Sequence, residues 1–271
     1  CLKTNGIPRG KVPIGCSHLT MFIDIHSKAL FYTIVGWADG FTGYLIDYGT
    51  YPDQKSHTFF LRSLTHTLAR STPKKGLEAT IYAGIERLCQ SKLGREWRRD
   101  DGAQMRIDRC LIDANWGSST EVVYQFCRQS DFSGILTPTH GKYVGASGTP
   151  MSEYKKKAGD RLGLNWKIPI VRRTRFVRHA IYDTNFWKSF VQSRLSVSMG
   201  DPGCLSLHGA KPAIHTLIAQ HLTAEYRVRT EGRGRTVDEW KLRASGVDNH
   251  WLDCLVGCHV GASMCGVALS G

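Results

Sequence analysis

The chain has 271 residues, 41% of them hydrophobic, and carries 36 Lys and Arg against 23 Asp and Glu. It contains no apolar run near the roughly 20 residues that cross a bilayer and no charged-then-apolar leader, so we expect no membrane partner and no secretion signal. Its net charge of +13 favours a polyanionic partner, because Lys and Arg placed on phosphates release counterions.

The first half of the chain predicts an alternation of strands and helices. Three mostly apolar stretches are separated by short turns, at residues 19–26, 29–38 and 43–51. Short turns between such stretches predict an antiparallel meander. Apolar residues at helical spacing then follow over residues 57–69 and 77–91.

A fourth strand is expected over residues 105–113, and it ends at Asp113. Ser118 or Ser119 can cap the helix that follows, and residues 133–142 predict a fifth strand. Three meander strands, a helix, a strand, a helix and a strand is the order of the ribonuclease H-like fold. The sequence therefore predicts an α/β domain with a mixed central sheet, although fold order alone does not assign a function.

The second half of the chain adds a loop, two arginine-rich hairpins and three helices to this core. The loop is expected over residues 143–160, the hairpins over 165–183 and 226–241, and the helices over 184–196, 213–226 and 249–265. The chain has no GxxxxGK[ST] motif and hence no phosphate-binding P-loop of its own.

Basic residues cluster in this second half of the chain. Such clusters are either solvent-exposed surface or a binding site for nucleic acid. Three clusters in one half of the chain favour the nucleic acid. Lys142, just after the fifth strand, is a candidate for the neighbourhood of the scissile phosphate. The residues that we expect to contact DNA are Lys142, Arg172, Arg173, Arg175, Arg229, Arg233 and Arg235.

The nine cysteines are odd in number and form no CxxC pair, which favours buried thiols in a reduced, intracellular protein. A zinc site built on Cys16 with His18, or on Cys258 with His259, lacks its second pair of ligands.

Two aspartates occupy unusual positions in the predicted sheet. Asp24 lies between Ile23 and Ile25 in an apolar strand, where a charge is costly unless it pairs with an arginine or binds a metal. Asp113 ends the fourth strand, which is adjacent to the first in a ribonuclease H-like sheet. Both carboxylates are therefore expected at one edge of the same cleft.

The last helix brings more polar groups to that cleft at its N-terminal end, from among Asp248, His250 and Asp253. His250 and Asp253 are three residues apart, so they share a face of the helix. Hard oxygen ligands suit Mg²⁺ or Mn²⁺, and two such ions about 4 Å apart promote phosphodiester hydrolysis. We therefore expect a two-ion site.

Four stretches in this order resemble the nuclease domain of the large terminase subunit of tailed bacteriophages, nearest its lambda-type group. They are "TMFIDIHSKALFYTIVGWADGFTGYLIDYG", "CLIDANWGSSTEVVYQFC", "DTNFWKSFVQSRL" and "DNHWLDCLVGCHVGASM". The resemblance implies an endonuclease that cuts concatemeric, double-stranded viral DNA during genome packaging. It further implies the portal protein and the small terminase subunit as partners, and the host cytoplasm as the location.

In this family an ATPase domain precedes the nuclease domain, and the start at Cys1 with no P-loop agrees with a fragment that lacks it. Residues 1–17 are then the linker from that upstream domain, and residues 18–271 the nuclease domain. Its functional residues carry over to Asp24 on the first strand, Asp113 on the fourth and Asp253 on the last helix.

One position departs from the family pattern, because His250 stands where relatives usually have an acid three residues before the helix aspartate. We expect His250 to replace a carboxylate ligand, with Asp253 close by as an alternative or supporting group, which would favour Mn²⁺ over Mg²⁺. The alternatives are that Asp253 or Asp248 is the ligand, and that His250 caps the helix or faces DNA.

Two other functions fit the same residues. One is a different ribonuclease H-like enzyme, such as a transposase, an integrase or a resolvase. The other is a non-catalytic DNA-binding module whose site has degenerated. The stretches "DTNFWKSF" and "DNHWLDCL" favour the terminase over both.

Overall fold

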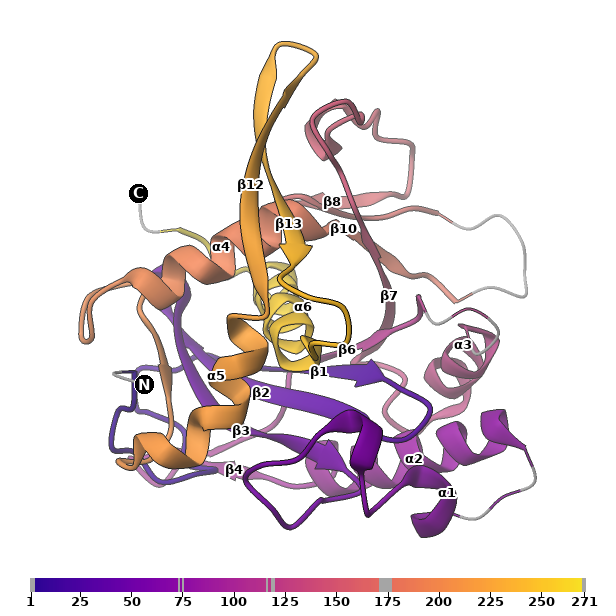
Figure 1. Ribbon diagram of the computed structural model, residues 1–271, viewed down its shortest axis with the longest axis vertical. Helices are drawn as coiled ribbons and strands as arrows, with labels where there is room; N and C mark the ends of the chain where they lie inside the picture. Colours follow the sequence, from indigo (N-terminus) through magenta and orange to yellow (C-terminus); the bar gives the residue numbers. More distant parts are fainter. Residues whose placement is uncertain are drawn as a thin grey trace.

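The computed structural model describes residues 3–72, 74, 76–115, 117, 120–170 and 177–269. Its centre is a nine-stranded sheet with the order β11-β3-β2-β1-β6-β7-β10-β9-β8 (Figure 1). The strands are β1 (His18–Ile25), β2 (Leu30–Ala38), β3 (Thr42–Tyr51), β6 (Arg109–Asp113), β7 (Leu136–Lys142), β8 (Arg161–Gly163), β9 (Trp166–Ile168), β10 (Ala180–Asp183) and β11 (Leu205–Leu207). A separate small ribbon pairs β4 (Trp97–Arg98) with β5 (Gln104–Met105).

The middle of this sheet has the topology predicted from the sequence. β1, β2 and β3 form an antiparallel meander, β6 joins β1 in parallel, and β7 joins β6 in parallel. The sheet is therefore mixed, and the ribonuclease H-like fold is confirmed. The arginine-containing stretch 165–183 forms the antiparallel pair β9–β10, although residues 171–176 within it lie outside the described residues.

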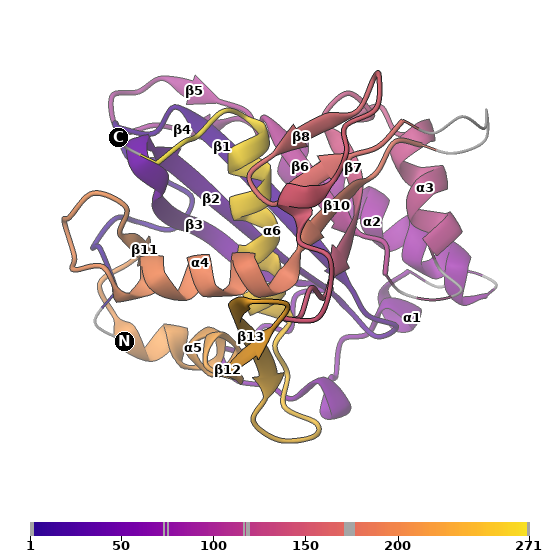
Figure 2. The same cartoon turned by 90° about the horizontal axis from the view of Figure 1, so that it is seen from above.

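Helices cover both faces of the sheet (Figure 2). One face carries α2 (Leu77–Leu93) and α3 (Thr120–Gln129), and the other carries α6 (His250–Met264) with α4 (Thr184–Ser196) and α5 (Thr216–Leu222) packed around it. The predicted capping serines of α3, Ser118 and Ser119, lie outside the described residues.

The helix predicted over residues 57–69 was wrong. That stretch holds only a 3-10 turn, Leu61–Ser63, and the first residues of the short α1 (Leu68–Ser71). Its apolar spacing has another cause, because Phe59 and Leu61 pack from a loop against the core beneath α6. The side-chain amide of Gln54 donates to the carbonyl of His66, which ties the loop down without helical hydrogen bonds.

The helix predicted over residues 213–226 is shorter than expected. A 3-10 turn, Pro212–His215, precedes α5, and the chain enters β12 (Glu225–Gly232) directly afterwards. Thr223 ends α5 by donating its hydroxyl to the carbonyl of Ala219. β12 and β13 (Arg235–Leu242) form the second predicted hairpin, which projects from the body of the domain (Figure 1).

α6 is buried on almost all sides, because it lies between the sheet and the layer of α4 and α5. Gly257 permits this close approach, since a Cβ atom there would lie 1.7 Å from the ring of Phe22 on β1. Side chains of a strand alternate between faces, so Phe22 and Asp24 point to the α6 side of β1. The packing of α6 thus decides what surrounds Asp24.

All eight described cysteines are free, and seven of them are buried. None of the described helices is both long and apolar enough to span a bilayer. The N-terminal stretch packs on the domain, where Val12 is fully buried and Thr4 forms a bridge with Leu207 of β11.

Candidate metal centre

The adjacent parallel strands β1 and β6 bring Asp24 and Asp113 together. Ile23 lies opposite Ile112 in their register, and each aspartate is the next residue along its strand. Neighbouring strands lie about 4.8 Å apart, and side chains paired across them share a face. Both carboxylates therefore lie on the α6 side of the sheet, at the edge where the sequence predicted them.

Negative charge is poorly compensated at this edge. Burial raises the pKa of Asp24, and the neighbouring His250 only partly offsets this effect. Burial, with the charges of Asp24 and Asp253, raises the pKa of Asp113 to about 7. One buried and one half-buried carboxylate with raised pKa values form a site that a cation would stabilise.

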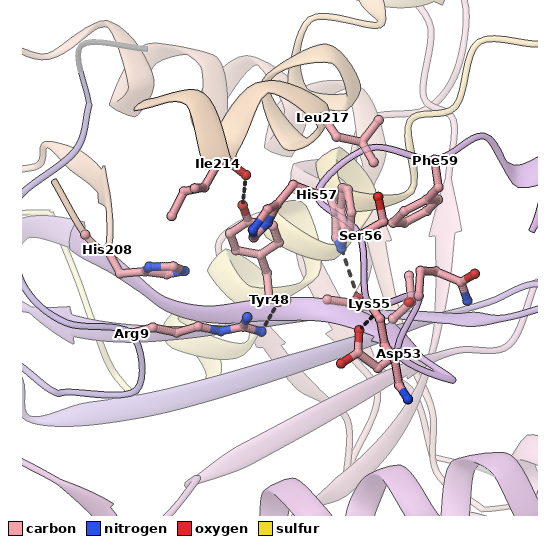
Figure 3. A pocket seen from close by; sticks show the side chains of 15 residues that line it. Arg9, Tyr48, Asp53, Lys55, Ser56, His57, Phe59, His208, Ile214 and Leu217 are labelled. Atoms are coloured by element: carbon pink, nitrogen blue, oxygen red, sulfur yellow. Dashed lines mark hydrogen bonds between the residues drawn. The ribbon is translucent and has the colours of Figure 1, made fainter. Parts of the chain in front are cut away.

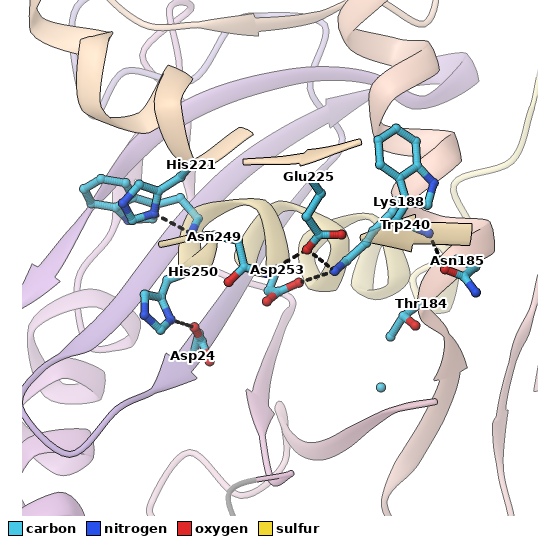
Figure 4. A network of polar contacts seen from close by, with 12 residues as sticks. Asp24, Thr184, Asn185, Lys188, His221, Glu225, Trp240, Asn249, His250 and Asp253 are labelled. Atoms are coloured by element: carbon cyan, nitrogen blue, oxygen red, sulfur yellow. Dashed lines mark hydrogen bonds and ion pairs between the residues drawn. The ribbon is translucent and has the colours of Figure 1, made fainter. Parts of the chain in front are cut away.

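His250, the first residue of α6, contacts Asp24 directly (Figure 4). Its Nδ1 lies 2.5 Å from Oδ2 of Asp24, and its ring stacks on Phe31 with the centroids 4.3 Å apart. Burial lowers the pKa of His250. The hydrogen bond to Asp24 and the charge of Asp24 raise this pKa by more than burial lowers it, so the net shift is upward. The partner of Asp24 is thus a histidine rather than the arginine considered as an alternative to metal.

Asp253 lies one turn further along α6 and contacts a lysine that the sequence did not single out. Nζ of Lys188 on α4 lies 3.2 Å from Oδ1 of Asp253 and 2.5 Å from Oε1 of Glu225, the first residue of β12. Burial lowers the pKa of Lys188, but the two carboxylates raise it more, so the ammonium stays charged. Asp253 is therefore held by α4, and its charge contributes to the raised pKa of His250.

Asp248, the third acid considered for this site, serves the neighbouring loop. Its Oδ2 accepts a hydrogen bond from the backbone N–H of Leu61 at 3.3 Å. This contact anchors the loop between β3 and α1 against the start of α6.

The donor set fits a hard divalent cation, since the carboxylates of Asp24, Asp113 and Asp253 are the ligands that Mg²⁺ and Mn²⁺ prefer. Among the described residues, however, no group of three or more His, Cys, Asp or Glu side chains is arranged to hold a metal ion. The hydrogen bonds explain why, because Oδ2 of Asp24 is held by His250 and Oδ1 of Asp253 by Lys188. Binding of an ion through Nδ1 of His250 would require the Asp24–His250 contact to open.

The predicted DNA-binding residues fall into different environments. Lys142 is exposed at the end of β7, and strand alternation from Thr139, which pairs with Asp113, turns it to the face opposite that carboxylate. Arg229 and Arg233 are exposed on the hairpin. Arg172, Arg173 and Arg175 lie outside the described residues.

Arg235 has a structural partner rather than a free guanidinium. It donates from Nη2 to the carbonyls of Gly145 and Gly148, which fastens the hairpin to the loop after β7. Arg229 lies 3.8 Å from Oδ1 of Asp238, across the hairpin. Part of the arginine charge predicted for DNA is therefore used within the protein.

A cavity of about 440 Å³ is lined by Trp251, the residue after His250, together with Arg9 and Tyr48 (Figure 3). Tyr48 crosses it and donates its hydroxyl to the carbonyl of Ile214. Arg9 reaches the cavity but is engaged by the carboxylate of Asp47. None of the three carboxylates of the candidate centre lines this cavity.

A mixed sheet with two strand-end aspartates and a buried helix crossing above them is the arrangement of a ribonuclease H-like domain. A family model for the endonuclease domain of the terminase large subunit gpA matches residues 2–270, and the chain belongs to this family. The resemblance drawn from the four sequence stretches is confirmed, and with it a phage nuclease that acts on DNA.

One solved structure found to be similar is the K428A mutant nuclease domain of the large terminase subunit gp2 of bacterial virus Sf6, with manganese. Its TM-score is 0.43 at 14% sequence identity, over 90% of this chain and 88% of that chain. The search of curated proteins returned no match.

Proposed function

We propose that this domain cuts concatemeric viral DNA during genome packaging by metal-dependent hydrolysis, with two Mg²⁺ or Mn²⁺ ions as cofactors. The observation that carries the proposal is the pair of aspartates at the ends of adjacent parallel strands, Asp24, which is buried, and Asp113, which is half-buried. Burial and the charge of Asp24 raise the pKa of Asp113 to about 7, so His250 does not fully compensate the negative charge of this pair. Perturbed carboxylates of this kind gather at functional sites.

Four residues form the proposed centre. Asp24 and Asp113 hold the metal, and the third arm comes from His250, with Asp253 as the alternative or supporting ligand. When bound, two divalent ions would supply activation of a water molecule and stabilisation of the leaving oxygen. His250 must lose the Nδ1 proton and release Asp24 before that nitrogen can bind a cation.

The surroundings of His250 favour its role in the site. Phe31 stacks on one side of the ring, and His26 and His221 approach it edge-on or tilted, at 5.7 and 6.2 Å between centroids. These rings restrict the orientation of the imidazole and leave 17% of the His250 side chain exposed. A ligand held in this way is positioned before the cation arrives.

The DNA substrate would approach along the exposed hairpin arginines and the end of β7. Arg229 and Arg233 are exposed on the hairpin, and the proposed metal site lies near its base, because Glu225 of β12 contacts the Lys188–Asp253 pair. Lys142 is exposed at the end of β7, although its side chain lies on the face opposite that of Asp113. We propose the arginine-rich stretch 171–176 as a further contact.

The remaining parts of the proposal come from membership of the family. They are a preceding ATPase domain joined through residues 1–17, a nuclease domain over residues 18–271, the portal protein and small terminase subunit as partners, and action in the host cytoplasm.

Cleavage by aspartate variants tests the proposal. Asp24→Asn and Asp113→Asn are each expected to lose cleavage of plasmid DNA in Mn²⁺ by at least about a hundredfold, because an amide neither carries charge nor binds the cation well. Binding of DNA should stay close to wild type, since affinity comes from arginines and lysines. Asp101→Asn, at an exposed aspartate paired with Arg99, is the matched control and should cut normally.

Two results would contradict the proposal. Full cleavage by either variant removes that residue from the site. No cleavage by the wild type in Mn²⁺, compared with an EDTA control, would favour the DNA-binding module without catalysis.

A further inference from the structure

The stretch "DTNFWKSF" has a role in the structure that the proposed cleavage does not explain. Asp183 begins α4 by accepting hydrogen bonds from the backbone N–H groups of Asn185 and Phe186. Trp187 is fully buried in the core. This fixed start of α4 places Lys188 against α6 and the base of the hairpin (Figure 4).

Lys188 joins three elements through one buried ammonium group. It contacts Oε1 of Glu225 from β12 and Oδ1 of Asp253 from α6. Asn249 donates its Nδ2 to the same Oε1 of Glu225 at 2.7 Å. The side chains of Lys188 and Glu225 are 13% and 3% exposed, whereas that of Asp253 is 35% exposed.

Stability alone does not account for this arrangement. Burying an ammonium and a carboxylate costs several kcal/mol per ion, and packed apolar residues often replace such a pair without loss. Oε2 of Glu225 is buried with no hydrogen-bond partner among the described residues, which adds to the cost. The benefit therefore lies with the exposed member, Asp253.

Resting on the proposed metal site, we propose that Lys188 is a positioning residue for Asp253. The ammonium holds Oδ1, which fixes the side chain of Asp253 and leaves Oδ2 for a cation beside Asp24 and Asp113. Glu225 cancels the charge of Lys188, so that the lysine orients the carboxylate without repelling the metal. The lysine touches neither the cation nor the DNA in this role.

The test removes the ion pair as a unit. K188M/E225Q leaves no uncompensated buried charge and is expected to melt within a few degrees of wild type. Isothermal titration of Mn²⁺ into metal-stripped protein is expected to show affinity about 10- to 100-fold weaker, the usual loss when a supporting partner of a ligand is removed. A crystal structure of the variant should show Asp253 in a different rotamer or in several.

Two further variants sharpen this experiment. Lys92→Met is the matched control, because Lys92 also forms a buried ion pair, with Asp47 at 2.7 Å, yet lies away from the site; its Mn²⁺ affinity should equal that of wild type. Lys188→Arg keeps the charge and the donors, and should retain most of the affinity. It also serves as the readout if the double variant does not fold.

The outcomes separate this inference from the proposed function. If the wild type binds no Mn²⁺ at millimolar concentration, the metal site itself is wrong and the inference fails with it. If the wild type binds but K188M/E225Q binds equally or more tightly, or keeps the same Asp253 rotamer, only the positioning role is wrong. A loss in Lys188→Arg as large as in the double variant would also overturn it.

Discussion

Variants of His250 distinguish two hypotheses for the third metal ligand, which is either His250 or Asp253. As a ligand, it should be essential, so His250→Ala is expected to be nearly inactive in Mn²⁺. His250→Asp should recover cleavage and respond better to Mg²⁺, because a carboxylate is the harder and more negative donor. Initial rates in both metals, with Asp253→Ala alongside, measure this. Normal cleavage by His250→Ala together with an inactive Asp253→Ala would make Asp253 the ligand.

The pH dependence of cleavage gives a second view of His250. Its pKa is raised above the usual 6.5 when Asp24 accepts its hydrogen bond, and the protonated ring cannot bind metal. Loss of cleavage on acidification should therefore begin above pH 6.5 at low Mn²⁺ and move to lower pH as Mn²⁺ is increased. A pH profile of cleavage that does not change with the Mn²⁺ concentration would contradict the competition between protons and Mn²⁺ for His250.

Asp113 makes the metal-free domain sensitive to pH in the opposite sense from an ordinary salt-bridged acid. Its pKa is about 7 when folded, against 3.8 ordinarily, so the folded state keeps a proton that the unfolded chain releases. Stability from this group is present at low pH and is lost as pH rises from about 4 to about 7. In EDTA, Asp113→Asn should gain stability relative to wild type over that range, on the order of 2–4 kcal/mol.

Urea unfolding at several pH values checks this expectation, with added Mn²⁺ as the control that removes the effect. Parallel profiles for Asp113→Asn and wild type would show that the carboxylate is not perturbed.

Residues of the site differ in how far the sequence reveals them. Asp24 and Asp113 were predictable because a charge inside an apolar strand demands a partner. Lys188 and Glu225 were not, since one was a basic residue among many and the other fell at the end of a predicted helix. They are 37 residues apart and meet only through the packing of α4 on the hairpin base. Whether the four predicted residues bind metal stays a prediction.

At the scale of elements, strands were predictable where turns bound an apolar run. The order of these strands then predicted the antiparallel meander and the two parallel strands, β6 and β7, beside it. The failed helix over residues 57–69 shows the limit of periodicity. Apolar residues of a loop packed against the core can share helical spacing, and only the tertiary contacts of Phe59 and Leu61 distinguish the two cases.

The contact between α6 and β1 depends on glycine. Gly257→Ala places a methyl group 1.7 Å from the ring of Phe22, which helix propensity, worth about 1 kcal/mol, cannot offset. We expect a lower melting temperature, and weaker cleavage because the polar end of α6 shifts away from Asp24. Gly261→Ala is the control, since its Cβ would lie 3.3 Å from Thr20 and needs only a small adjustment. Equal stability of both variants and wild type would contradict this packing.

At the scale of the whole molecule, the excess positive charge should appear as salt-dependent binding of DNA. Removing the exposed hairpin arginines, in R227S/R229S/R233S, should weaken binding and reduce the slope of log affinity against log salt by about 2. A smaller change is expected from Arg227 and Arg229 than from free arginines, because both lie near Asp238. Fluorescence anisotropy at several salt concentrations measures the slope.

The control for this experiment lowers the net charge by the same amount but on a distant face. R87S/R95S/R106S removes three exposed arginines from the α2 side of the domain and should leave the slope nearly unchanged. Equal effects of the two triple variants would mean that net charge, rather than the hairpin, attracts the DNA.

The position of α6 on β1 also has a consequence for synthesis of the chain. His250 and Asp24 are 226 residues apart, so this contact can form only after nearly the whole chain has been made. At about 5–20 residues per second, a ribosome needs on the order of ten to fifty seconds between these two residues. Until α6 has been made, Phe22 lacks the helix that covers it in the folded domain. Asp24 meets its partner only when the final helix has been made, so a partly translated chain carries no assembled nuclease centre.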